Sequence, residues 1–206
     1  MSNNTMNIRL AGVGGQGILV ASEILCDVLL ASGLDVKKTE VHGMAQRGGT
    51  VISDVRFGPK VYSPIVPEGK VDILLAFEQM EALRYLHSLK PGGTVIVNEQ
   101  RIFPSSVALG KIDYPAEIEK YLMTVAANVI SINALALAKK AGSVKAVNVC
   151  LLGALATCLN IKEPIWEAVI TEKFKGRNLD ANLRAFELGR EASLTRDLKL
   201  GVVIPK

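Results

Sequence analysis

The sequence predicts one α/β domain with an open, mostly parallel Rossmann-like sheet, a β-hairpin-like excursion and a helical C-terminal third. Three observations lead to this class. Apolar runs of strand length alternate with helical patterns, glycine clusters lie at their junctions, and only helical patterns follow residue 132. A chain of 206 residues can bury roughly 70 per cent of its unfolded surface as one domain. We therefore expect a single domain over 1–206, with its core over about 7–192.

The first half of the chain supplies most of the sheet. Its expected elements are strand 7–12, helix 16–32, strand 35–41, strand 50–57, strand 71–77, helix 78–89 and strand 94–98. The connection between strands 35–41 and 50–57 is far shorter than the dozen or more residues that a parallel crossover needs. These two strands are therefore expected to be antiparallel or splayed. Pro91-Gly92-Gly93 predicts a turn into the last strand of this half.

The second half is mainly helical. Its expected elements are helix 115–122, strand 128–131, helix 132–141, helix 146–160, helix 163–172 and helix 179–193. The apolar window 146–161 is too short to span a bilayer and is expected to form a core or interface helix. In the last helix, the spacing puts Leu179, Leu183, Phe186 and Arg190 on one face.

Composition excludes several classes of function. The net charge is only +4 and the basic residues are scattered, which disfavours nucleic-acid binding. Cys26, Cys150 and Cys158 form no CxxC pair, so the chain is expected to hold neither an iron–sulfur cluster nor structural zinc. The start of the chain is polar, so no signal peptide is expected. These features predict buried thiols, a cytoplasmic location and no association with a membrane.

A glycine-rich loop follows the first expected strand and reads Gly12-Val13-Gly14-Gly15-Gln16-Gly17. Glycines at a strand–helix junction let backbone N–H groups approach an anion, which the helix dipole also favours. Glu40, near the end of the second strand, lies where a ribose-binding acid would be expected in a dinucleotide fold. Three interpretations stay open at this point: an anion site, tight helix–sheet packing, and a complete dinucleotide site. The absence of a helical crossover after the second strand weighs against the last.

A second loop, between strands 35–41 and 50–57, is rich in recognition groups. Arg47 can donate two hydrogen bonds to a carboxylate or phosphate, and His42 is the one candidate proton-transfer group. The alternative is that Arg47 is anchored to Glu40 or Asp54 and only shapes the loop. The residues that the two loops nominate as a ligand, anion or interface site are Gly12, Gly14, Gly15, Gln16, Gly17, Glu40, His42, Gly43, Met44, Gln46, Arg47, Gly48 and Gly49.

Other polar residues fit no catalytic arrangement. His87 is expected on an exposed helix end. Glu78 and Glu81 are three residues apart and could form an acid pair, but a solvated helix face is expected for them. No nucleophile elbow accompanies His42, so no Ser-His-Asp arrangement can be nominated. No cluster has the spacing of metal ligands. We therefore nominate no catalytic residue with certainty and no metal site.

Both loops together resemble the gamma domain of the 2-oxoacid:ferredoxin oxidoreductases. The residues that carry the resemblance are Gly12 to Ile18, Glu40 to Gly49, Tyr62-Ser63-Pro64, Glu78 to Leu83, Leu89 to Gly93 and Asn182 to Glu187. The resemblance covers roughly 7–192. The Gln-Arg-Gly-Gly core is shared across the wider family, which includes pyruvate and ketoisovalerate enzymes. The preceding Val-His-Gly-Met is similar to the small (beta) subunits of the indolepyruvate branch.

This resemblance implies a subunit that is inactive alone. Such enzymes decarboxylate a 2-oxoacid oxidatively, with coenzyme A as co-substrate and ferredoxin as electron acceptor. A large alpha-type partner subunit is expected to carry thiamine diphosphate, Mg and the iron–sulfur clusters. The two loops are then expected to face that partner, or an anion such as a coenzyme A phosphate or a substrate carboxylate. The rival interpretations are a free-standing NAD(P)-binding oxidoreductase and a non-enzymatic regulatory or assembly module.

Overall fold

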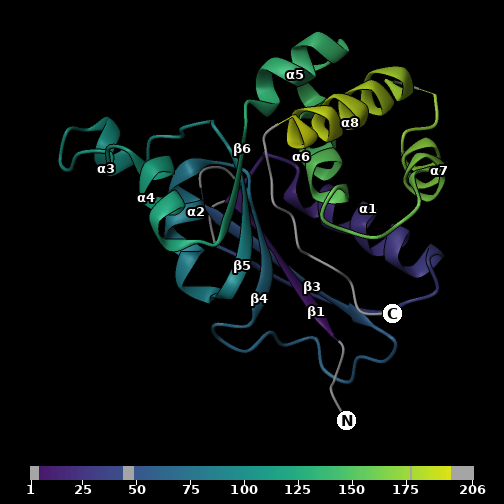
Figure 1. The fold of residues 1–206 in the computed structure, drawn as a ribbon. Coiled ribbons are helices and arrows are strands. Elements are labelled where there is room, and N and C mark those ends of the chain that lie inside the picture. The colour runs from purple at the N-terminus through teal and green to yellow at the C-terminus, as the bar shows by residue number, and fades with distance from the viewer. Residues whose placement is uncertain (1–4, 44–48, 177, 196–206) are drawn as a thin grey trace.

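The fold was analysed in a computed structural model, which describes residues 5–43, 49–176 and 178–195. A six-stranded sheet with the order β2-β3-β1-β4-β5-β6 forms its centre (Figure 1). The strands are β1 (Met6–Val13), β2 (Asp35–His42), β3 (Thr50–Gly58), β4 (Val71–Ala76), β5 (Leu89–Asn98) and β6 (Asn128–Ile132). Buried apolar runs form β1, β4 and the second part of β5, because helices cover both faces of the sheet there, whereas the edge strand β2 is largely polar.

The β-hairpin-like excursion is confirmed. Strand β3 pairs antiparallel with β2 on one side and with β1 on the other. On its other side, β1 pairs in parallel with β4, which is followed by parallel β5 and β6. Every strand except β3 thus runs in the same direction. The predicted open, mostly parallel sheet is confirmed, and β3 separates β1 from β2.

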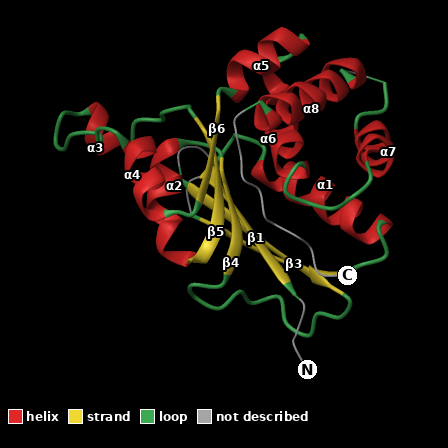
Figure 2. Cartoon of the chain, viewed as in Figure 1, coloured by secondary structure: helices red, strands yellow, loops and turns green. Residues whose placement is uncertain are grey.

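Helices cover both faces of the sheet (Figure 2). The helices are α1 (Ile18–Ala31), α2 (Gln79–Tyr85), α3 (Ser105–Ala108), α4 (Ile118–Val125), α5 (Ala134–Ala141), α6 (Val147–Ala156), α7 (Glu163–Lys173) and α8 (Leu179–Leu194), with 3-10 turns at Leu86–Ser88 and Val144–Ala146. Helices α1 and α5 to α8 lie on one face, and α2 to α4 lie on the other (Figure 1). None of the described helices is both long and apolar enough to cross a membrane.

The alternation of side chains along β1 divides the core in two. Ile8 and Leu10 lie in the larger cluster, under α1 and α6, whereas Ala11 lies in the smaller cluster with residues of α2 and α4. Most of the hydrophobic driving force therefore comes from the face that carries the C-terminal helices.

Helix α6 is a core helix of this chain. All of its residues from Asn148 to Ala156 are buried, because α8 and α1 cover it on different sides. A helix that is apolar around its whole circumference belongs in an interior. The expectation that this helix is buried against a partner is therefore wrong.

Two glycines allow α6 and α8 to pack closely. A methyl group on Gly153 would lie 2.0 Å from the Phe186 carbonyl oxygen, and one on Gly189 would lie 1.9 Å from the Cys150 carbonyl oxygen. Of the residues expected to share one face of the last helix, Phe186 lies in the larger core and Leu183 packs against it. Small residues such as Ala185 and Gly189 provide much of the remaining contact.

Several element boundaries differ from the predictions. Helix α1 begins at Ile18 rather than at residue 16, because Gly17 precedes it in the left-handed conformation. The expected turn at 91–93 lies inside β5, where a register shift against β4 absorbs the extra residues. The expected helix 115–122 lies at Ile118–Val125 instead, and α3 was not predicted.

Candidate functional site

The carboxyl ends of β1 and β4 meet at the point where the chain reverses its direction of winding. From β1 the chain crosses through α1 to one edge of the sheet, and from β4 it crosses through α2 to the other edge. Helices α1 and α2 consequently cover opposite faces (Figure 1). Ligands of open α/β sheets bind in the crevice beyond such a switch point. The first glycine loop lies there, directly after β1.

Gln16 ties this loop to the neighbouring strands. Its Oε1 accepts a hydrogen bond from the Val13 N–H at 2.7 Å, and its Nε2 donates to the Phe77 carbonyl at 3.0 Å. The same Nε2 lies 3.4 Å from Gln100 Oε1, just beyond β5. Asn98 Nδ2 also donates to the Phe77 carbonyl, at 3.1 Å. Side-chain amides thus fix the loop by pairing its buried donors and acceptors.

The glycines of the loop have different roles. A methyl group on Gly12 would lie 2.7 Å from Gln16 Oε1 and 2.8 Å from Phe77 Cβ, so Gly12 is needed for packing. Gly17 has a φ of +79° and leaves only 2.8 Å between such a methyl and Asn148 Nδ2. Gly15 has a φ of +102° but faces open space. Tight packing therefore explains Gly12 and Gly17, whereas Gly15 leaves one side of the loop free.

That free side borders a cleft of about 470 Å³. The residues that line it are Gly15, Gln16, Gly17, Gln100, Leu135, Val144, Lys145, Val147 and Asn148. Three side-chain amides and one ammonium group provide its polar functions, and apolar side chains from α5 and α6 form the rest of the wall. Asn148 Nδ2 donates to the Gly17 carbonyl at 3.3 Å and so joins the wall to the loop.

The electrostatics of the cleft favour an anion. The 14-residue helix α1 begins beside it, with no side-chain cap and no acidic residue in its first turn. The first N–H groups of a helix carry partial positive charge, and that charge is not neutralised here. Lys145 adds a full positive charge from the opposite wall. The cleft can therefore hold a phosphate or carboxylate group by helix-end and ammonium contacts.

The two glycine loops lie together. The Gly14 N–H donates to the Gly49 carbonyl at 2.9 Å, and the Gly43 N–H donates to the Thr50 carbonyl at 3.1 Å. His42 is the last residue of β2. Met44, Gln46, Arg47 and Gly48, and the side chain of His42, lie outside the described residues. The structure thus joins the ends of the second loop to the first.

The arrangement around Glu40 argues against a dinucleotide site. Because β3 lies between β1 and β2, Glu40 is two strands away from the glycine loop, at about 5 Å per strand. Lys38 Nζ lies 2.6 Å from its carboxylate. Asp54, the other suggested anchor for Arg47, accepts two hydrogen bonds from Arg9 at 2.7 and 2.8 Å. A ribose-binding acid is therefore missing from its expected place next to β1.

The expectation of a solvated face for Glu78 and Glu81 is wrong. Glu78 is 1% and Glu81 is 3% exposed, and Ile102 before α3 and Thr50 at the start of β3 lie against them. Glu78 caps α2 by accepting a hydrogen bond from the Glu81 N–H at 2.5 Å. Burial raises the pKa of the Glu78 carboxyl above its usual value, although backbone N–H groups partly offset this.

Glu81 lies beside the start of β3. Its Oε1 accepts from Arg84 Nε at 2.9 Å and lies 3.4 Å from Thr50 Oγ1. Its Oε2 is buried and has no hydrogen-bond partner among the described residues. Two buried carboxyl groups thus lie at the same edge of the sheet as the cleft, on the face covered by α2.

The remaining titratable residues agree better with the sequence. His87 is exposed and lies 3.3 Å from Glu68. Cys150 and Cys158 are buried thiols, and burial raises the pKa of Cys150 to about 12 and that of Cys158 to about 11. In the described ranges, no group of three or more His, Cys, Asp or Glu residues could hold a metal ion. We accordingly derive no metal-dependent step from this chain.

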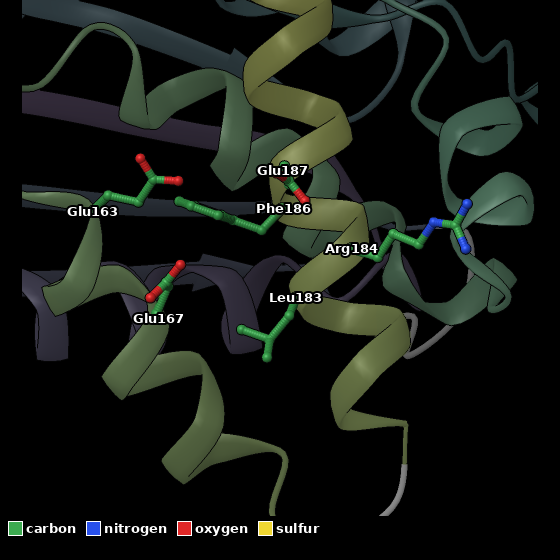
Figure 3. A pocket seen from close by; sticks show the side chains of 6 residues that line it. All are labelled: Glu163, Glu167, Leu183, Arg184, Phe186 and Glu187. Carbon is green, nitrogen blue, oxygen red and sulfur yellow. The ribbon is translucent and has the colours of Figure 1, made fainter.

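A second cavity, of about 360 Å³, lies between α7 and α8. Figure 3 shows Glu163 and Glu167 of α7 facing Leu183 and Phe186 of α8, while Arg184 extends away from α7. Glu163 is paired with Arg190 at 3.0 Å. This cavity has an acidic rim and an apolar base, and it lacks the convergent amides and open glycine of the first cleft.

Sequence reasoning missed Gln100, Lys145 and Asn148. Gln100 gave a usable signal, since it lies just beyond the carboxyl end of an apolar strand, where α/β proteins bind ligands. Lys145 and Asn148 gave none. Asn148 is 131 positions from its partner Gly17, and only the packing of α6 against α1 brings the two together.

Comparison with known proteins identifies the family. The family model described as pyruvate ferredoxin/flavodoxin oxidoreductase matches residues 7–192. The chain is 43% identical to the indolepyruvate oxidoreductase subunit IorB of Thermococcus kodakarensis, over 91% of this chain and 95% of that protein. It is 32% identical to the 2-oxoglutarate synthase subunit KorC of Methanothermobacter marburgensis, over 89% and 94% of the two chains.

Solved structures show the same fold. The gamma subunit of a keto/oxoacid ferredoxin oxidoreductase from Geobacter sulfurreducens matches with a TM-score of 0.67 and 24% identity, over 92% of this chain and 98% of that one. A 2-oxoglutarate:ferredoxin oxidoreductase from Magnetococcus marinus, with coenzyme A bound, matches with a TM-score of 0.72 and 25% identity. That match covers 98% of this chain but 33% of the longer one. The predicted resemblance is confirmed, and the chain belongs to the pyruvate ferredoxin/flavodoxin oxidoreductase family.

Proposed function

We propose that this chain is the small subunit of an indolepyruvate:ferredoxin oxidoreductase. The observation that carries the proposal is its identity of 41 to 43% with three indolepyruvate oxidoreductase subunits, over at least nine-tenths of both chains. Identity to 2-oxoglutarate synthase subunits is lower, at 31 to 32%. The reaction is the oxidative decarboxylation of an aryl pyruvate to an acyl-CoA, and ferredoxin receives the electrons.

The cleft beside Gly15 is the part of this chain that we assign to coenzyme A. A related structure contains bound coenzyme A, and a phosphate group of that molecule suits an uncapped helix end opposite an ammonium group. Gln100 and Asn148 then orient the anion through side-chain amides, while Gln16 holds the loop in place. The chain contributes binding and orientation to the reaction, and none of these groups acts as a nucleophile.

The redox chemistry belongs to a large partner subunit in this proposal. Thiamine diphosphate, Mg and the iron–sulfur clusters are placed there, because Cys26, Cys150 and Cys158 lie apart in this chain and no metal-ligand group occurs among the described residues. When bound, thiamine diphosphate supplies the carbanion chemistry of decarboxylation. The small subunit closes one side of the coenzyme A site. His42 stays the one candidate proton-transfer group of the chain.

Two variants test the assignment of the cleft. One is expected to raise the KM for coenzyme A, and the other is expected to leave it unchanged. The chain is co-expressed with its large subunit, and indolepyruvate-dependent ferredoxin reduction is measured at varied coenzyme A concentration. Lys145→Glu reverses a charge that lines the cleft, so the KM for coenzyme A is expected to rise at least about tenfold. Lys120→Glu, on exposed α4 across the sheet, is the matched control and should leave that KM unchanged.

The same assay separates the alternatives. A wild-type complex that turns over pyruvate, ketoisovalerate or 2-oxoglutarate but not indolepyruvate would assign the subunit to another branch of the family. An unchanged KM for coenzyme A in Lys145→Glu would remove the cleft from the proposal. Tight binding of NAD(H) or NADP(H) by the isolated chain would favour a free-standing dehydrogenase, against which the position of β3 already argues.

A further inference from the structure

The segment 59–70, which we call the braced loop, connects β3 to β4 and presents two large apolar side chains to solvent. Tyr62 is 82% and Ile65 is 63% exposed. The side chains on either side of this pair are directed inward: Val61 is 2% exposed, and Val66 packs against the smaller core cluster. The exposure of Tyr62 and Ile65 therefore follows from the backbone conformation of the loop, which directs the flanking side chains inward.

Arg56 fixes the backbone at Ile65 and at Ser63, the residue after Tyr62. Its Nη1 donates to the Ser63 carbonyl at 2.9 Å and to the Ile65 carbonyl at 2.5 Å. Its Nε donates to Asn7 Oδ1 at 2.8 Å, and Asn7 is itself buried at the start of β1. One guanidinium group thus links the outermost part of the loop to the body of the sheet.

Both ends of the braced loop are also anchored. At its start, the Val61 N–H donates to Asp35 Oδ2 at 2.9 Å. At its end, the Lys70 carbonyl accepts from Asn7 Nδ2 at 2.8 Å. Pro59, Pro64 and Pro67 remove further backbone freedom. The loop is therefore held by hydrogen bonds to Arg56, Asp35 and Asn7, none of which uses the side chain of Tyr62 or Ile65.

A preformed loop with an outward tyrosine has the properties of an interface anchor. The entropy lost on binding is small when the backbone is already ordered, and tyrosines are enriched among the residues that dominate interface energies. The loop lies at the amino edge of the sheet, because Met6 of β1 is opposite Phe57 at the end of β3. The cleft beside Gly15 lies at the other end of the strands, where their carboxyl ends are. A partner on the braced loop would leave the cleft free.

We propose that the braced loop docks into an apolar pocket of the large subunit, with Tyr62 and Ile65 as its anchors. The proposal rests on the proposed function. The occupant follows from the comparisons: close relatives are subunits, and in one related structure the equivalent fold is a third of a longer chain. A fold of this family is thus accompanied by further protein of the same enzyme.

Reconstitution of the separately purified subunits tests this docking. The small subunit is titrated into a fixed amount of large subunit, and the half-saturating concentration is read from ferredoxin reduction. For Tyr62→Ser with Ile65→Ser, this concentration is expected to rise at least about tenfold, as for loss of interface anchors. Maximal turnover and the KM for coenzyme A should not change. Leu30→Ser, which removes a 56% exposed leucine from α1, is the matched control.

A third variant tests the brace, and each outcome is decisive. Arg56→Met keeps both anchors but frees the loop, and it should also raise the half-saturating concentration. If the double variant reconstitutes like wild type, the docking assignment is wrong while the proposed function stands. Loss of a wild-type homodimer in sedimentation, with unchanged affinity for the large subunit, would assign the loop to a second copy instead. If wild type itself fails to bind and activate the large subunit, the proposed function fails, and the docking assignment with it.

Discussion

Capping and burial have opposite effects on the charge of the Glu78 carboxyl. Its carboxylate caps α2, which favours the charged form, but it is 1% exposed, which disfavours charge. Burial is the larger effect and raises the pKa of Glu78. A carboxyl whose pKa is raised in the folded state stabilises the fold fully only below its unfolded pKa. That stabilisation is lost as pH rises through the folded value.

Glu78→Gln should therefore change how stability depends on pH. The amide cannot ionise, and its oxygen can still accept the hydrogen bond from the Glu81 N–H. As pH rises above 4.5, the usual pKa of this carboxyl, the free energy of unfolding of Glu78→Gln should rise relative to wild type, by at most about 1.4 kcal/mol per pH unit. Denaturant titrations at several pH values measure this difference.

Glu117→Gln is the control for Glu78→Gln. Glu117 lies on the surface with its side chain 69% exposed, so its variant should parallel wild type over the same range of pH. Parallel curves for Glu78→Gln as well would show that the buried carboxyl keeps its ordinary titration.

Individual residues also show where sequence reasoning reached the site. Gly12 to Gly17 were predicted because a glycine run between a strand and a helix is a local signal. The burial of Glu78 and Glu81 was missed, because the segment that covers them, including Ile102, comes from beyond the next strand. Charge in a sequence predicts exposure only when nothing distant folds over it.

At the scale of elements, the contact of α6 with α8 is the tightest in the larger core. Alanine at Gly153 or Gly189 would put a methyl group about 2 Å from a carbonyl oxygen of the facing helix, and backbone cannot move aside as a side chain can. Each substitution should lower the free energy of unfolding by about 3 kcal/mol or more. Thermal and denaturant unfolding of the purified chain measure the loss.

The losses of stability in the two glycine variants should not be additive. Once one methyl group has pushed the helices apart, the second costs less, so the double variant should lose less than the sum of the single ones. Ala181→Ser, which adds an atom at a half-exposed position of α8, should be close to neutral. Additive losses would mean that the two contacts relax independently.

Elements whose structure is determined by nearby residues in the sequence were predicted well. The pattern of β1, α1 and β2 and the short connection to β3 predicted the antiparallel excursion, which is confirmed. The boundaries of β5 and the position of α4 were not predicted. In β5 the strand continues through Pro91-Gly92-Gly93 because a register shift against β4 accommodates it, and that shift is a property of the pair of strands.

For the whole molecule, the proposed coenzyme A cleft and the braced loop lie at opposite ends of β1. They share no described residue, so changes at the two places should act independently. In the combined variant Lys145→Glu, Tyr62→Ser and Ile65→Ser, the KM for coenzyme A and the half-saturating concentration should each match the separate variants within about twofold. Reconstituted turnover at varied subunit and coenzyme A concentrations gives both values.

A departure much larger than twofold would indicate that docking and coenzyme A binding are coupled through the sheet. The control is the combination of Lys120→Glu with Leu30→Ser, which carries the same kinds of substitution away from both places. This pair should behave as wild type in both measurements.

The position of β3 between β1 and β2 also constrains how the chain can fold during synthesis. In a regular βαβ unit, the two strands can pair as soon as both exist, but here β1 and β2 have no hydrogen bonds to each other. A nascent chain that ends before Thr50 therefore carries two strands with unpaired edges, which are prone to aggregation. Only after β3 has emerged, through Gly58, can the sheet begin to close. The β2-β3-β1 half of the sheet thus forms only when β3 inserts between the two earlier strands.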